Sequence, residues 1–365
     1  MADRPRQLPE GVPPLNSYYV YLTGGCNLAC RHCWLSPTFQ PDGGTGGHLD
    51  YDLFALAIEE GIPLGLQSVK LTGGEPLLHP HLVRMVDLLR EKNLRLTIET
   101  NGTLLTASLA RYLKDQSTLN FISVSLDGAN PETHETFRGV KGSFEKACQG
   151  IRFLVEVGYR PQVIMGLHAG NENEIESLVR MAEQLGAGSV KLNMVQPIGR
   201  GKLMTQRGQA LDVLRLIELG KWVDTLQERS TLRLHYSWPI AFYGLNRLQN
   251  LDGYSCSIFN ILGILPDGHL AMCGIGVHVP ELCYGMLGRD HIPEIWVSNP
   301  LLVELRKSLP VSLEGVCREC IFRDQCVGAC VAENYHISGK LGAPFWFCQE
   351  ARSLGIFPEN RLTTG

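Results

Sequence analysis

The chain has 365 residues, of which 44% are hydrophobic and 19% are charged, and its formal net charge is −4. This length allows one large domain and a smaller appended one, and the charge gives no electrostatic reason to expect nucleic acid as a partner. The apolar runs, such as 258–266, are too short to cross a bilayer, and residues 1–16 lack the apolar core of a signal peptide. We therefore expect a cytoplasmic protein without a membrane partner.

From residue 18 to about residue 195, β-rich runs alternate with amphipathic helical stretches. The predicted strands are 18–23, 68–72, 94–100, 121–126, 161–167 and 189–195, and the predicted helices are 51–61, 80–92, 106–114, 144–157 and 172–185. Thr106 and Ser143 are predicted to be helix N-caps, and Gly158 and Gly186 are expected where helices end. Six alternations predict a parallel α/β sheet, either doubly wound or curled into a partial barrel, with functional groups at the C-terminal ends of the strands.

The later part of the chain has a different character. The Gly-rich and basic segment 199–208 is predicted to be a mobile loop, followed by a helix at 209–229 and a connector that reaches residue 254. From Cys256 onward the sequence is rich in loops and cysteines and shows little periodicity. Such a region cannot easily build a large apolar core, so metal clusters would supply the missing cross-links.

The chain contains twelve cysteines, and they are strongly segregated. Three lie within 26–33, Cys148 stands alone as a predicted buried helix residue, and eight fall between Cys256 and Cys348. Without a secretion signal, clustered cysteines indicate metal ligands rather than disulfides. The two groups predict two separate cluster-bearing regions.

The first group has the spacing C-x3-C-x2-C in a Gly-led loop that follows the first strand. Cys26, Cys30 and Cys33 can hold three corners of a [4Fe–4S] cluster and leave the fourth iron without a protein ligand. A structural zinc site is the alternative, but such sites normally close with four ligands at two-plus-two spacing. His32, between Cys30 and Cys33, has little freedom to become that fourth ligand.

This motif resembles the signature of the radical S-adenosylmethionine (radical SAM) superfamily. The resemblance implies that the three cysteines bind the cluster, that its open iron chelates SAM, and that His32 packs near the adenine. Further segments resemble the family's SAM-binding elements at successive strand ends. They supply the candidate residues Gly73, Gly74, Glu75, Asn101, Ser125, Asp127, Arg138, Gln196, Pro197 and Ile198. Each motif alone is more often a tight turn or a cap, and their order along the chain carries the interpretation.

The second group resembles the SPASM (twitch-type) domain of radical SAM proteins. The resemblance implies two auxiliary [4Fe–4S] clusters, a distal one held by Cys317, Cys320, Cys326 and Cys348, and a proximal one held by Cys256, Cys273 and Cys330. Some relatives have a fourth proximal ligand where this chain has Leu262, so an open iron, Cys283 or an oxygen ligand remain as alternatives. One cluster or a zinc site is also possible, because C-x2-C pairs are common in zinc ribbons.

The resemblance thus selects a partial (β/α)6 TIM-type barrel with a loop-rich C-terminal domain. The predicted regions are an N-terminal extension (1–17), the radical SAM barrel (18–200), a linker helix and connector (201–253), the SPASM domain (254–357) and a tail (358–365).

The appended domain is similar to that of enzymes that mature ribosomally made peptides, and the opening motif resembles Nif11-type leader-peptide maturases and spliceases. The implied reaction is reductive cleavage of SAM to a 5′-deoxyadenosyl radical, followed by crosslinking, thioether formation, epimerisation or backbone excision in a precursor peptide. One alternative is formylglycine formation on a sulfatase, although Gly274 stands where such enzymes usually have an acidic residue. RNA modification is disfavoured by the lack of a basic extension. An iron–sulfur electron-transfer or scaffold protein is the alternative from a different class.

Two kinds of protein partner are expected. About seventeen residues precede the first strand, too few for a winged-helix leader-recognition domain. We therefore expect a separate small protein, or the barrel itself, to capture the leader by strand addition. The family also implies a flavodoxin or ferredoxin as reductant. No nucleic-acid partner is expected.

Overall fold

The computed structural model describes residues 7–42, 44, 46–244, 248 and 256–363. Residues 1–6 of the predicted extension, 364–365 of the predicted tail and the predicted start of the SPASM domain at 254 lie outside the described residues. No helix among the described residues has both the length and the apolar character needed to span a membrane.

The described strands form one main sheet in the order β12-β11-β10-β1-β4-β5-β6-β7-β8-β9. From β10 to β9 neighbouring strands are parallel, whereas β11 and β12 are antiparallel additions. Their bounds are β1 (Ser17–Tyr21), β4 (Ser68–Thr72), β5 (Arg95–Thr100), β6 (Leu119–Ser125), β7 (Gln162–Leu167), β8 (Ser189–Met194), β9 (Arg233–Tyr236), β10 (Ile261–Ile264), β11 (His269–Ala271) and β12 (Cys283–Met286). A second, two-stranded sheet pairs β2 (Gly25–Cys26) with β3 (Thr38–Phe39).

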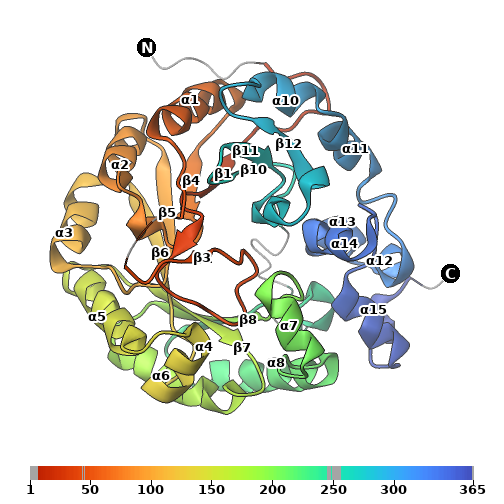
Figure 1. The fold of residues 1–365 in the computed structure, drawn as a ribbon. Helices are drawn as coiled ribbons and strands as arrows, with labels where there is room; N and C mark the ends of the chain where they lie inside the picture. Colours follow the sequence, from red (N-terminus) through yellow and green to blue (C-terminus); the bar gives the residue numbers. More distant parts are fainter. Residues whose placement is uncertain (1–6, 43, 45, 245–247, 249–255, 364–365) are drawn as a thin grey trace.

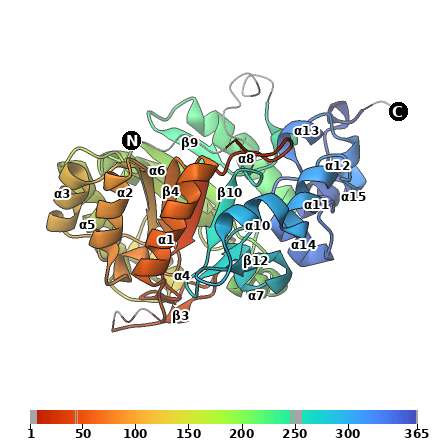
Figure 2. The ribbon, with the colours of Figure 1, turned by 90° about the horizontal axis from the view of Figure 1, so that it is seen from above.

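Helices surround this sheet on its outer side (Figure 1). The bounds of the described helices are α1 (Tyr51–Gly61), α2 (Leu82–Glu91), α3 (Ala107–Gln116), α4 (Pro131–Arg138), α5 (Ser143–Glu156), α6 (Ile175–Gln184), α7 (Arg200–Gln206), α8 (Val213–Gln227), α10 (Ile292–Ser298), α11 (Pro300–Ser308), α12 (Gly315–Glu319), α13 (Arg323–Cys326), α14 (Val331–Ser338) and α15 (Trp346–Ser353). The outer ring includes α1, α2, α3, α5 and α6, whereas α7 lies against the cysteine loop. Helix α10 packs on α1 and α15 packs on α8, so the C-terminal helices fill the gap between the first and last helices of the barrel. Figure 2 shows the same C-terminal helices gathered at one side of the barrel. The predicted partial barrel is confirmed, since the sheet curls while β12 and β9 remain its two edges.

The alternation along each strand separates a packed face from a polar interior. In β4, Val69 and Leu71 are fully buried in the main hydrophobic core, whereas Lys70 between them is only partly buried. Successive side chains of a strand point to opposite faces, so one face packs on the helices and the other faces the barrel interior. Burying a valine or leucine side chain contributes about 1.5–3 kcal/mol, which makes a one-residue register slip costly.

Several local expectations were wrong. The segment 199–208 contains α7 rather than a loop, because the backbone N–H of Arg200 is held by the carbonyl of Cys33 and the hydroxyl of Ser36. The predicted connector contains β9, which extends the parallel sheet. Helix α5 begins after Gly142, so Ser143 is its first residue and not its cap, whereas Thr106 caps α3 as predicted.

The C-terminal region is more regular than its sequence indicates. Its strands β10, β11 and β12 join the main sheet, and β10 pairs directly with β1 in the first part of the chain. The sheet is therefore continuous across the connector. The boundary at residue 254 remains a prediction from the cysteine pattern.

Candidate active site

The three cysteines of the first motif lie together at the C-terminal end of β1. Cys26 and Cys30 are buried with Leu28 in one small hydrophobic cluster, and Cys33 and Val140 pack against it. The β2–β3 pair carries Cys26 at its end, so this loop is itself part of a sheet. The sequence predicted this grouping from spacing alone.

Hydrogen-bond donors surround these sulfurs. The backbone N–H of Leu28 lies 3.4 Å and the Asn101 side-chain amide 3.9 Å from the Cys26 sulfur, and Arg138 donates to the Cys30 sulfur at 3.5 Å. Burial, with Glu75 and the neighbouring thiols, raises the pKa of Cys26 to about 12. Because thiols ligate iron as thiolates, metal binding must displace these protons, and the donors would then stabilise the charged sulfurs.

The Gly73-Gly74-Glu75 segment follows β4 and packs directly on the cysteine loop. Gly73 has φ +130°, and a Cβ at Gly74 would lie 1.9 Å from the carbonyl oxygen of Gly25. These two positions therefore require glycine. The close approach is also held by the backbone N–H of Glu75, which donates to the carbonyl of Gly25.

The Glu75 carboxylate is fully buried and joins two strand ends. It accepts hydrogen bonds from the Thr100 hydroxyl at 2.6 Å and from the backbone N–H of Asn101 at 2.8 Å. It also accepts from the backbone N–H of Leu77 at 3.0 Å. Burial raises the pKa of this carboxyl group despite these donors. In this structure Glu75 fixes the position of Asn101, whose amide reaches both Asn27 and Cys26.

Asp127 and Arg138 form a buried ion pair that the sequence did not predict. The Arg138 guanidinium donates to one oxygen of Asp127, and the backbone N–H of Gly166 donates to the other at 2.8 Å. Burial opposes ionisation of Asp127, but the Arg138 charge holds its pKa below its ordinary value. Arg138 is the last residue of α4, not part of a turn, and it links Asp127 to Cys30. The Asn-Pro sequence, with Asn130 as the N-cap and Pro131 as the first helical residue, is the signal that could have revealed helix α4.

An aromatic stack lies beside the cysteine motif. The rings of His32 and Phe137 stack with centroids 4.3 Å apart, and Phe137 stacks on His168 at 4.1 Å. Burial lowers the pKa of His32 to about 3, so its imidazole is neutral. His168 was missed from the sequence because it follows β7 without a recognisable motif.

Several buried polar atoms in this region have no partner among the described residues. They include Nδ1 of His32, Nε2 of His168, and Nε and Nη2 of Arg200. Buried polar groups are nearly always satisfied, so these atoms fit a polar ligand such as the adenosyl part of SAM. Arg200 follows the predicted residues Gln196, Pro197 and Ile198, of which Ile198 is buried in the main core. The other predicted residue, Ser125, is partly exposed at the end of β6.

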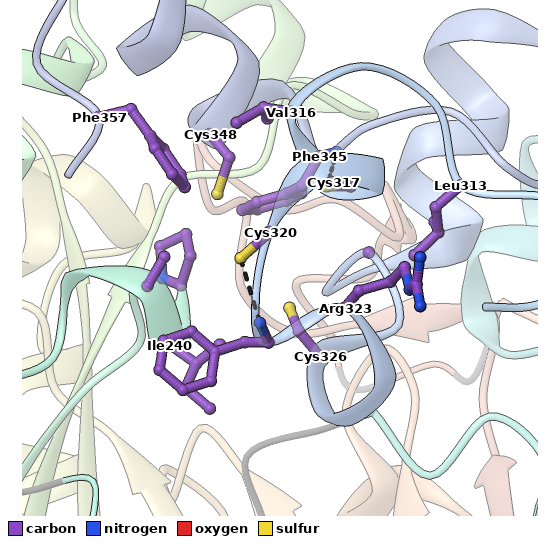
Figure 3. Close-up of a pocket in the computed structure, with 14 residues that line it drawn as sticks. Ile240, Leu313, Val316, Cys317, Cys320, Arg323, Cys326, Phe345, Cys348 and Phe357 are labelled. Atoms are coloured by element: carbon purple, nitrogen blue, oxygen red, sulfur yellow. Dashed lines mark hydrogen bonds between the residues drawn. The ribbon is translucent and has the colours of Figure 1, made fainter. Parts of the chain in front are cut away.

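Four cysteines of the second group surround one small apolar cavity (Figure 3). Cys317, Cys320, Cys326 and Cys348 line it together with Ile240, Phe345 and Phe357. Backbone N–H groups donate to two of the sulfurs, from Phe345 to Cys317 at 3.4 Å and from Phe322 to Cys320 at 3.5 Å. Burial raises the pKa of Cys348 well above its ordinary value, and the three neighbouring thiols raise it further. This is the set that the resemblance assigns to the distal cluster.

The predicted proximal ligands Cys256, Cys273 and Cys330 influence one another's pKa values. Burial raises the pKa of Cys330, and Glu333, Cys273 and Cys256 raise it further. Leu262 is fully buried in the main core on β10, so it is a packing residue. Cys283 instead lines a cavity of about 620 Å³ with Tyr21, Thr23 and Gly74. Among the described residues, no three His, Cys, Asp or Glu side chains converge closely enough to hold a single metal ion.

Comparisons with known proteins identify the family of this chain and proteins with a similar fold. The sequence model of the radical SAM superfamily matches residues 20–182. An AdoMet-dependent heme synthase of Methanosarcina barkeri is 30% identical, over 87% of this chain and 91% of the relative. The mycofactocin maturase MftC of Mycobacterium tuberculosis is 26% identical, over 91% of this chain and 82% of the relative.

A solved structure has a similar fold. Streptococcus suis SuiB, bound to its precursor peptide SuiA, superposes with a TM-score of 0.71 at 16% identity and covers 92% of this chain and 76% of its own. At that identity the likeness concerns the fold. With the cysteine motif at the barrel mouth and a 30% identical relative covered almost completely, the chain belongs to the radical SAM superfamily and is a radical SAM enzyme.

Proposed function

We propose that this enzyme cleaves SAM reductively and removes a hydrogen atom from a ribosomally made precursor peptide held at the barrel. The observation that carries the radical chemistry is the grouping of Cys26, Cys30 and Cys33 amid donors to their sulfurs. These cysteines would hold a [4Fe–4S] cluster, which supplies the electron that converts bound SAM into methionine and a 5′-deoxyadenosyl radical. The peptide substrate is supported by the likeness to SuiB with its precursor peptide and to mycofactocin maturase.

Within this site the chain's own residues position SAM. His32, Phe137 and His168 present a stacked aromatic wall, and the unpartnered ring nitrogens of the two histidines suit the polar edge of an adenine. Gly73 and Gly74 allow the backbone to approach a ligand closely, while Glu75 and Asp127 hold the strand ends in place. Ser125, Gln196 and Pro197 remain predicted SAM contacts.

We further propose that the four-cysteine cavity holds a distal auxiliary cluster. Its fit rests on four sulfurs facing one apolar space, with backbone donors to two of them (Figure 3). The proximal cluster is proposed for Cys256, Cys273 and Cys330. Cys283 lies with the larger cavity, which favours an open iron or an oxygen ligand over Cys283 as the fourth position.

A second candidate substrate is a tetrapyrrole side chain. It is favoured by one observation, the 30% identity with an AdoMet-dependent heme synthase over 91% of that relative. The same radical chemistry would then act on a porphyrin side chain instead of a peptide.

Anaerobic turnover tests both the proposed cleavage of SAM and the proposed substrate. Reconstituted enzyme with SAM and dithionite is expected to release 5′-deoxyadenosine, and a scaffold protein would release none. Release should rise when the true substrate is added, either iron coproporphyrin III or the peptide encoded beside the gene. If neither raises it, and no product mass change is seen, both substrate proposals are wrong.

A further inference from the structure

The barrel interior is unusually polar for a packed core. The residues that alternate with the buried core positions of β4, β5 and β8 include Lys70, Thr97, Glu99, Lys191 and Asn193. Barrels without an internal ligand usually fill this space with branched apolar side chains. Lys70 and Glu99 keep side-chain exposures of 21% and 36%, so the interior is open at this level. Such a space is suited to a polar ligand.

One wall of this interior holds a compensated charge. The Lys70 ammonium lies 3.3 Å from a Glu99 oxygen and 4.0 Å from the centre of the Tyr19 ring. Burial opposes the charge of Lys70, but Glu99 and the other acidic groups nearby raise its pKa above the ordinary value. The positive charge of Lys70 in turn favours the thiolate forms of Cys256 and Cys273 and so opposes the rise in their pKa values that burial causes. Lys70 therefore has a carboxylate, an aromatic ring and the predicted proximal cluster as partners.

The opposite wall holds a lysine without such partners. Lys191 lies at the centre of β8, in register with Ile164 of β7 and His235 of β9. No hydrogen bond or ion pair joins its ammonium to another residue in the part of the chain that the structure describes. Lys70 on β4 and Lys191 on β8 both alternate with buried core residues, so both point away from the helices, and three strands separate β4 from β8 in the curled sheet. Burial lowers the pKa of Lys191. Among the causes of its pKa shift, Lys191 differs from Lys70 in having no cysteine thiol.

The charges of the two walls do not balance. The Glu99 carboxylate is paired with Lys70, so Lys191 has no carboxylate partner among the described residues. An ammonium group that leaves water without a partner is costly. An anionic ligand group between Lys191 and Lys70 would complete the balance. A carboxylate suits this position, because its two oxygens accept charge-assisted hydrogen bonds from ammonium groups.

We propose that Lys191, assisted by Lys70, binds a carboxylate of the substrate inside the barrel. This inference rests on the proposed function, because it places the substrate below the strand ends that carry the cysteine motif. The carboxylate can belong to a porphyrin propionate or to an acidic side chain of a peptide, and the two sources share this chemistry. Lys191 is thus a substrate-positioning residue that selects for negative charge.

The test measures binding by the reconstituted holoenzyme with two pairs of probes. The first pair is coproporphyrin III and its neutral tetramethyl ester, followed by porphyrin fluorescence in the same detergent. The second is a pool of random heptapeptides, scored by the frequency of Asp and Glu in the bound fraction against the input. The variants are Lys191→Gln, Lys191→Arg and Lys70→Gln, with Lys146→Gln on the exposed face of α5 as the matched control.

Wild-type enzyme is expected to prefer one of the charged probes by at least about tenfold in Kd or enrichment. Lys191→Gln should lose this preference, Lys191→Arg should retain part of it, Lys70→Gln should weaken it, and Lys146→Gln should match wild type. Preference for coproporphyrin III assigns the carboxylate to a propionate, and enrichment of Asp and Glu assigns it to a peptide. The proposal is overturned if neither pair shows a preference, or if Lys191→Gln binds as wild type while its circular dichroism and iron content are unchanged.

Failure of this site is distinguishable from failure of the proposed function. Release of 5′-deoxyadenosine by wild-type enzyme without any probe reports SAM cleavage alone. If release occurs but no charged probe is preferred, the carboxylate site is wrong and the radical chemistry stands. If release is absent, the proposed function itself fails.

Discussion

The two cysteine regions of this molecule are built in opposite ways. Around Cys26, Cys30 and Cys33 lie charged and polar groups, including a buried ion pair, a buried glutamate and unpartnered ring nitrogens. Around Cys317, Cys320, Cys326 and Cys348 the lining is chiefly aromatic and aliphatic, and the donors to sulfur that it supplies are backbone N–H groups. Polar groups prepared in a buried place suit a ligand that enters, reacts and leaves. An apolar lining suits a group that stays bound and shielded.

The largest expected effect separates the two regions directly. Cys26→Ala should lower 5′-deoxyadenosine release by more than about 1,000-fold, because one corner of the reactive cluster loses its ligand. Iron content should fall by about four atoms per chain. The measurement is liquid chromatography of anaerobic reactions together with iron analysis. Cys148→Ala, in the core of α5, is the control and should keep both values. If Cys26→Ala released 5′-deoxyadenosine as fast as the wild-type enzyme, the assignment of this loop as the site of the reactive cluster would be refuted.

The ion pair at the first site should dominate its stability. Arg138→Met leaves the buried carboxylate of Asp127 without its partner and is expected to cost about 3–5 kcal/mol in the free energy of unfolding. Arg152→Met removes an exposed pair with Glu145 and should cost less than about 1 kcal/mol. Chemical denaturation of the two anaerobic variants compares these losses. Equal losses would show that the Asp127–Arg138 pair is no more important than a surface pair.

The pH dependence of stability should also reflect the first site. Burial lowers the pKa of His134 to about 4 from an ordinary value of 6.5, and its Nδ1 accepts from the backbone N–H of Asp127. Between these two pKa values the unfolded chain binds the proton and the folded chain does not, so stability rises with pH across this window. His134→Gln should flatten the profile by about 2 kcal/mol between pH 4 and 6.5, as measured by denaturation at each pH. An unchanged slope would mean that His134 does not titrate in this way.

The smallest effect on SAM cleavage is expected at the second region. Cys348→Ala should remove about four irons, yet lower 5′-deoxyadenosine release without substrate by less than about tenfold, because the apolar cavity lies apart from the cysteine motif. Cys148→Ala again serves as the control. If Cys348→Ala abolishes release as fully as Cys26→Ala does, the two regions do not have the separate roles proposed here.

Much of the first site was predictable because its signals are local. The spacing of Cys26, Cys30 and Cys33 and the two glycines before Glu75 depend on neighbours in the sequence, and the strands were found from their alternation. The Asp127–Arg138 pair, the His32–Phe137–His168 stack and the environment of Lys191 were not predicted. Each joins residues from different strands or helices, and their partners depend on the register of the barrel.

By itself, the sequence determined the parallel α/β pattern, the two cysteine groups and the family to which they point. Local propensity and ligand spacing are properties of short segments, so they survive without tertiary information. Only the tertiary structure decided that β10 joins β1, that α7 closes on the cysteine loop, and that Lys70 pairs with Glu99 inside the barrel. These features depend on which strands become neighbours, and that is settled by burial of the whole sheet against its helices.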